Sequence, residues 1–158
     1  MFKKLLTTRS LCVSAVIAAL YAALTLLLAP ISYGNLQCRV SEAMTLLPML
    51  MPSAIPGLFV GCLLANILGG ASILDVVFGS LATLLAAIGT YALRKKPLLA
   101  ALCPIVANGV IVGAVLSYVW ALPLLLTMAE VAIGEVGAVI IGFVMLAALK
   151  KVDLSKYQ

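Results

Sequence analysis

The chain has 158 residues, of which 65% are hydrophobic and 9% are charged, and its mean hydropathy is +1.28. Soluble domains carry about 45–50% apolar and about 25% charged residues, so a water-soluble fold with one buried core is excluded. The formal net charge is +5, and its placement along the chain is more informative than its sign. We predict an all-α membrane protein in which residues 1–158 form a single integral membrane domain.

Six apolar segments follow one another along the chain, and each is expected to be a membrane-spanning helix. They cover residues 10–30, 42–52, 54–70, 73–93, 97–119 and 123–149. Helix-breaking motifs mark most of the joints, as in PSAIPG between the second and third segments and LGGAS between the third and fourth. Pro97, after the basic RKK run, suits the first turn of the fifth helix.

The first segment has two interpretations. The MFKK start followed by an apolar run fits a signal peptide, and the topology does not exclude one. An apolar run of about 20 residues is longer than a signal core of 7–15, which favours a retained helix. Small residues at helical spacing allow another helix to approach closely, either within the bundle or from a partner protein. One such stripe is Ala15, Ala19 and Ala23, and the adjacent stripe is Ala18 and Ala22.

Basic residues predict the orientation of the helices. One group precedes the first segment, another follows the fourth, and the third follows the sixth; they are Lys3, Lys4 and Arg9, then Arg94, Lys95 and Lys96, then Lys150, Lys151 and Lys156. An even number of crossings separates these groups, so all three can lie on one side, which the positive-inside bias makes the cytoplasm. We therefore expect a multi-pass plasma-membrane protein with both termini cytoplasmic.

In this topology nearly all remaining polar and aromatic groups fall in the outer half of the membrane. The candidate substrate-binding residues among them are Gln37, Arg39, Glu42, Asn66, Asp75, Asn108, Tyr118, Trp120, Glu130 and Glu135. A carboxylate in a span costs roughly 2.5–3.5 kcal/mol, so these acids are expected to face a common interior. We predict a cup open to the outside and closed beneath by aliphatic side chains, since a channel would need polar lining along its whole length.

Several of these residues also have purely structural interpretations. Tyr118 and Trp120 suit an interfacial aromatic belt. Glu42 can complement the N-terminus of its helix, with the preceding serine as cap, and Arg39 can pair with Glu42 or with Asp75. The two asparagines, at positions 66 and 108, can bond across helices.

The charge balance of the predicted cup indicates the kind of ligand. One arginine faces four carboxylates, so the cup suits a cationic or hydrogen-bond-donating heterocycle better than an anion. Glu130 and Glu135 lie about 140° apart around a helix, so only one can point straight into a narrow pocket. No metal site, disulfide or cofactor is expected, because histidine is absent and the four cysteines are widely spaced, three of them in apolar runs where cysteine acts as a small hydrophobe.

Three stretches, QCRVSEAMTLLP, AIPGLFVGCLLANILGG and ILDVVFGSLATLLAA, resemble the QueT family. These proteins are substrate-binding S components of energy-coupling-factor (ECF) transporters and are linked to the uptake of queuosine precursors. The resemblance covers roughly residues 10–150, with the motifs in the expected order. Cys38 and Met44 depart from the family pattern, which affects only the expected shape of the pocket.

The resemblance implies a six-helix S component whose ligand site lies near the extracellular face, covered by the loops after the first, third and fifth helices. It also implies docking on a membrane scaffold subunit with two cytoplasmic ATPases, through an AxxxA pattern in the first helix, for which the two alanine stripes are candidates. The implied ligand is a 7-deazaguanine such as 7-aminomethyl-7-deazaguanine. The implied mechanism is binding and hand-over, with no enzymatic step and no nucleic-acid partner.

Three rival functions remain open from the sequence. The first is an S component for another vitamin or nucleobase-like ligand, and the second is a small self-assembling channel or exporter. The third is an intramembrane enzyme, which the lack of histidine and of Ser/Lys or Asp/Asp pairs on one helix face weighs against. The chain has no GxxxxGK[ST] loop, so an ATP-driven mechanism needs separate ATPase subunits.

Overall fold

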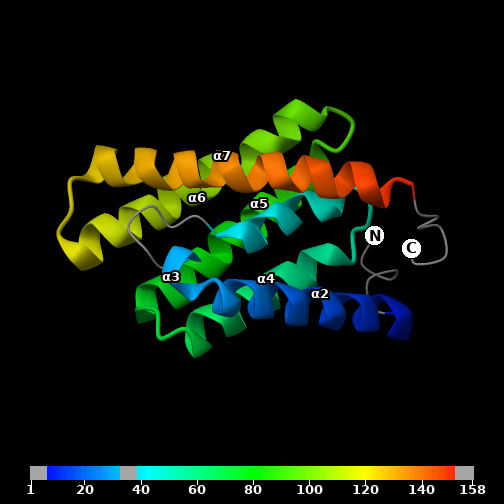
Figure 1. Cartoon of the computed structure of the whole chain (residues 1–158), viewed down its shortest axis with the longest axis horizontal. Coiled ribbons are helices and arrows are strands. Elements are labelled where there is room, and N and C mark those ends of the chain that lie inside the picture. Colours follow the sequence, from blue (N-terminus) through cyan, green and yellow to red (C-terminus); the bar gives the residue numbers. More distant parts are fainter. Residues whose placement is uncertain (1–6, 33–38, 152–158) are drawn as a thin grey trace.

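Helices form the framework of the computed structural model, which describes residues 7–32 and 39–151 (Figure 1). The elements are α2 (Thr8–Leu27), α3 (Ala29–Ser32), η1 (Val40–Met49), α4 (Ala54–Leu68), η2 (Asp75–Gly79), α5 (Ser80–Ala92), α6 (Pro97–Trp120) and α7 (Leu124–Leu149). η1 is a 3₁₀ helix, and η2 is a π-helical turn that continues into α5. No strand occurs in these described ranges, so the all-α prediction is confirmed.

Four of the six predicted spans are long and apolar enough to cross a membrane by themselves: α2, η2 with α5, α6 and α7. Two are shorter than the hydrocarbon core of about 30 Å. The 15 residues of α4 extend about 22 Å at the α-helical rise. The 10 residues of η1 extend about 20 Å at the 3₁₀ rise.

The short helix η1 lies inside the bundle. It contacts α2, α4, α5, α6 and α7, and in Figure 1 it runs as the cyan segment between α7 and α2. Its residues from Ser41 to Pro48 are buried, so the surrounding helices shield it from lipid. Close approach of α7 depends on Gly142, where an added Cβ would lie 2.7 Å from the carbonyl oxygen of Ala43. Because protein surrounds η1, it does not need the length of a lipid-facing helix.

Helices α2 and α4 pack closely through small residues. A Cβ added at Gly61 would lie 2.9 Å from the carbonyl oxygen of Ala18, so only glycine fits at this crossing. Ala18 and Ala22 are therefore buried inside the bundle. The other stripe remains exposed on the outer surface of α2, and it consists of Ala15, Ala19 and Ala23. The structure thus separates the two candidate stripes of the first helix.

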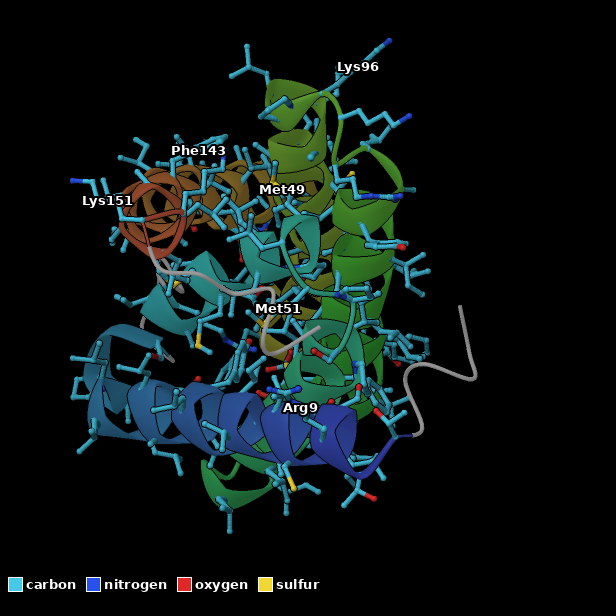
Figure 2. The ribbon with its side chains drawn as sticks, turned by 90° about the vertical axis from the view of Figure 1, so that its right-hand side faces the viewer. Arg9, Met49, Met51, Lys96, Phe143 and Lys151 are labelled. Carbon is cyan, nitrogen blue, oxygen red and sulfur yellow. The ribbon has the colours of Figure 1, made fainter. Side chains whose placement is uncertain are left out.

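The described basic residues of the three groups gather at one end of the bundle. α2 begins and α7 ends at the right-hand end in Figure 1, and Figure 2 looks onto this end, with Arg9, Lys96 and Lys151 labelled. The prediction that these groups share one side is confirmed for these residues. Met51, at the same end, belongs to an apolar core cluster that includes Ile17.

Candidate functional site

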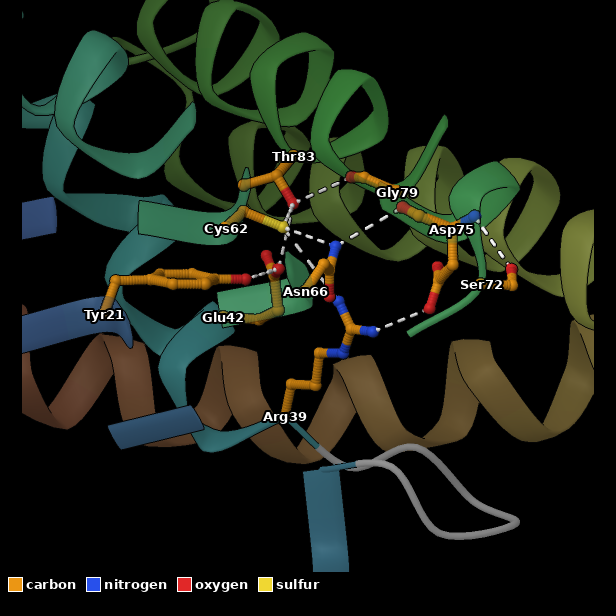
Figure 3. Close-up of polar contacts among 9 residues, drawn as sticks. All are labelled: Tyr21, Arg39, Glu42, Cys62, Asn66, Ser72, Asp75, Gly79 and Thr83. Carbon is orange, nitrogen blue, oxygen red and sulfur yellow. Dashed lines mark hydrogen bonds and ion pairs between the residues drawn. The ribbon is translucent and has the colours of Figure 1, made fainter. Parts of the chain in front are cut away.

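Polar side chains from seven of the helical elements meet in the interior of the bundle, and Figure 3 shows most of them. We call this set the polar cluster; it consists of Tyr21, Arg39, Glu42, Cys62, Asn66, Asp75, Thr83, Asn108 and Glu135. Each member is at most 5% exposed. Burial of so many polar groups in a membrane bundle is costly, which makes the polar cluster the leading candidate for a functional site.

Glu42 lies at the centre of the polar cluster. The Tyr21 hydroxyl donates a hydrogen bond to Glu42 Oε1, and the Thr83 hydroxyl lies 3.0 Å from the same oxygen. Asn108 and Arg39 also interact with this carboxylate. Glu42 does lie in the first turn of η1, as the helix-terminus interpretation expects, but Ser41 is not the cap: Arg39 takes the N-cap position, and the Ser41 hydroxyl lies 2.7 Å from that of Thr25.

Arg39 pairs with Asp75 in preference to Glu42. Its Nη2 atom lies 3.2 Å from Asp75 Oδ2, and both side chains are 5% exposed. Asn66 holds the segment that carries the acid, because its Nδ2 donates to the backbone oxygen of Asp75 at 3.3 Å. The π turn of η2 also needs Gly79, where an added Cβ would lie 2.8 Å from Asp75 Oδ1. Such π turns are frequent at functional sites.

Asn108 and Glu135 join the polar cluster from the two longest helices. Asn108 Nδ2 donates to Glu135 Oε1 at 2.9 Å, which confirms the predicted bond across helices for Asn108. Glycines bring these helices together: at Gly113 an added Cβ would lie 2.7 Å from Met128 Cα. The Glu135 carboxylate is close enough to Glu42 for the two charges to interact.

Several buried oxygens of the polar cluster have no hydrogen-bond donor among the described residues. They are Glu42 Oε2, Asn66 Oδ1, Asp75 Oδ1, Asn108 Oδ1 and Glu135 Oε2. All five are acceptors, whereas both amide groups already donate within the protein. A buried acceptor without a donor costs about 1–3 kcal/mol. The arrangement is therefore complementary to a ligand that donates several hydrogen bonds.

Other predicted site residues lie apart from the polar cluster. Tyr118 and Trp120, near the end of α6, are 80% and 69% exposed. Glu130 is half-buried on α7, so the structure takes Glu135 and not Glu130 into the interior. Gln37 lies outside the described residues.

Three members of the polar cluster were missed from the sequence. Tyr21 and Thr83 are single polar residues in apolar runs, and Cys62 was interpreted as a small hydrophobe. Cys62 is fully buried, and its sulfur lies 3.5 Å from Asn66 Nδ2 and 3.4 Å from the Thr83 hydroxyl. Helical spacing could have identified two of them, because residues four apart lie on the same face of a helix. Cys62 precedes Asn66 by four residues, and Thr25 follows Tyr21 by four.

Comparisons with known proteins establish the family of the chain. A curated relative, the "Queuosine precursor transporter QueT" of Lactococcus lactis subsp. cremoris (strain MG1363), is 32% identical over 159 aligned positions, which cover 90% of this chain and 93% of the relative. No solved structure matches the chain. The family model described as QueT transporter matches residues 11–151. The protein is therefore a transporter, which confirms the prediction that it is not an enzyme, and the chain belongs to the QueT transporter family.

Proposed function

We propose that the chain is the substrate-binding S component of an ECF-type importer and captures a queuosine precursor at the extracellular side for ATP-driven uptake. The proposed ligand is a 7-deazaguanine such as 7-aminomethyl-7-deazaguanine. The name of the relative from Lactococcus lactis, a queuosine precursor transporter, supports the substrate class. The observation that carries the proposal is the set of five buried acceptor oxygens without donors.

The hydrogen-bonding groups of this ligand match the polar cluster. A 7-deazaguanine offers a ring N–H, an exocyclic amine and a pyrrole N–H, and the aminomethyl form adds a protonated amine. A carboxylate can accept two adjacent N–H donors, as a guanine edge presents them. Three carboxylates face one guanidinium in the polar cluster, so its formal charge also favours a cation over an anion.

The position of the polar cluster supports capture from outside. Arg39 follows the link after α3, and Asp75 follows the link between α4 and η2. The short helix α3 and the link between α4 and η2 lie at the end of the bundle opposite the three basic groups (Figure 1). With the basic end in the cytoplasm, we propose that η1 and α4 complete six crossings and that the end of the bundle with α3 and the α4–η2 link faces outward.

An ATP-driven importer needs partner subunits, because this chain contains no nucleotide-binding motif. A membrane scaffold subunit with two cytoplasmic ATPases would supply the energy. We propose that the exposed stripe of α2, which consists of Ala15, Ala19 and Ala23, packs against this scaffold. The buried stripe, Ala18 and Ala22, already packs within the bundle and is not available.

Uptake into proteoliposomes tests the proposal. The chain is reconstituted with scaffold and ATPase subunits, and entry of labelled 7-aminomethyl-7-deazaguanine is followed with and without ATP. We expect accumulation only with ATP, and none when the ATPases carry an inactivating change in their nucleotide-binding loops. Entry through the chain alone would favour the channel or exporter instead. Binding of an unrelated vitamin, with no binding of 7-deazaguanines, would favour the other S component.

A further inference from the structure

The two carboxylates at the centre of the polar cluster differ in how well their charges are compensated. Glu42 receives hydrogen bonds from Tyr21 and Thr83 and interacts with Arg39 and Asn108. From the described residues, Glu135 receives one hydrogen bond, from the neutral amide of Asn108, and it interacts with the like charge of Glu42. The environment of Glu42 is therefore well supplied with donors and positive charge, and that of Glu135 is not.

No second cation is available for Glu135 within the described ranges. Arg39 is the one buried cation there, and its guanidinium is 3.2 Å from Asp75, with which it forms an ion pair. Glu135 is 3% exposed, so water does not screen its charge effectively. Its Oε2 atom and the Oδ1 atom of Asn108 both have no donor among the described residues.

We propose that Glu135 is the counter-ion for a protonated amine on the ligand and thereby determines specificity for the cationic form. Asn108 holds Glu135 Oε1, which leaves Oε2, together with Asn108 Oδ1, to accept from the ammonium group. Glu42, already compensated, takes neutral N–H donors of the heterocycle. This inference rests on the proposed function, because it assigns roles within the same site.

A chemical series on the unchanged protein tests the role of charge. The purified full chain is titrated by calorimetry with 7-aminomethyl-, 7-hydroxymethyl- and 7-cyano-7-deazaguanine, of which only the first is a cation. A charge-assisted hydrogen bond to a buried carboxylate predicts that the aminomethyl compound binds on the order of 30-fold more tightly than the hydroxymethyl compound. Equal affinities for these two compounds would overturn the inference while leaving the proposed function intact.

The substitution Glu135→Gln then locates the effect. We expect it to abolish the preference, with weaker binding of the aminomethyl compound and little change for the cyano compound. The matched control is Glu130→Gln, which removes a charge from the same helix at a half-buried position outside the polar cluster. Loss of affinity for all three compounds alike, or the same result from the control, would contradict the assignment to Glu135. Absence of binding by any compound to the unchanged protein would refute the proposed function itself.

Discussion

An ion pair within the polar cluster holds two distant parts of the fold together. Arg39 joins the start of η1 to Asp75 at the start of η2, although 35 residues lie between them in the sequence. Both side chains are almost fully buried, so each charge depends on the other for compensation. Removal of one partner from such a pair leaves an uncompensated buried charge and costs about 3–5 kcal/mol.

A double-mutant cycle tests this ion pair. Arg39→Gln is expected to lower the free energy of unfolding by about 3–5 kcal/mol, because Asp75 is left without its cation. The double variant Arg39→Gln/Asp75→Asn should lose less than the sum of the single variants, since the second change removes the stranded charge. Unfolding of the purified protein in detergent micelles provides the measurement. The control is Arg94→Gln, which removes an exposed guanidinium stacked on Tyr91, and fully additive effects would contradict the pairing.

At the residue scale, the sequence predicted that acids standing out in apolar runs would face a common interior. Glu42, Asp75 and Glu135 are conspicuous in this way, and the structure brings all three into the polar cluster. Sequence reasoning did not identify Tyr21 and Thr83, because a single hydroxyl is inexpensive to place in a membrane helix and does not stand out as a charge does. It could not separate Glu130 from Glu135 either, because the rotation of α7 is fixed by its packing against α6 and η1.

At the scale of the elements, the sequence predicted the long helices well. Pro97 begins α6 as expected, and α7 covers nearly the predicted segment. The 3₁₀ geometry of η1 was not predicted. Pro48 removes a backbone donor from this segment, but the continuous 3₁₀ run depends on the packing of η1 on all sides, which one sequence does not reveal.

The two alanine stripes of α2 give opposite expectations for the same substitution. Ala19→Leu adds volume on the exposed surface, so we expect a stable protein that still binds ligand but fails to copurify with the scaffold subunit. Ala18→Leu adds volume where α2 meets Gly61, so we expect a loss of stability of about 1–3 kcal/mol. Copurification from membranes and thermal unfolding in detergent distinguish the two effects.

The matched control for this pair is Ala147→Leu, an equal increase in volume at an exposed alanine on α7. It should leave both stability and scaffold binding unchanged. If Ala19→Leu copurified with the scaffold as well as the control does, the exposed stripe of α2 would not be the docking surface.

At the scale of the whole molecule, the chain separates its charges by sign. The described basic residues other than Arg39 gather at one end of the bundle (Figures 1 and 2), whereas the described acids other than Glu130 lie in its buried interior. Composition and the positive-inside bias predicted this arrangement because both reflect the cost of charge in lipid. The interior partners were not predictable, because they depend on how six segments rotate against one another.

Calorimetric titration of 7-aminomethyl-7-deazaguanine into purified variants tests most directly whether the polar cluster is the ligand site. Glu42→Ala and Glu135→Ala should each weaken binding about tenfold or more, because each removes a buried charged acceptor. Trp120→Ala, at a 69% exposed position outside the cluster, should leave the affinity within about twofold. Unchanged affinity in both folded glutamate variants would contradict the account.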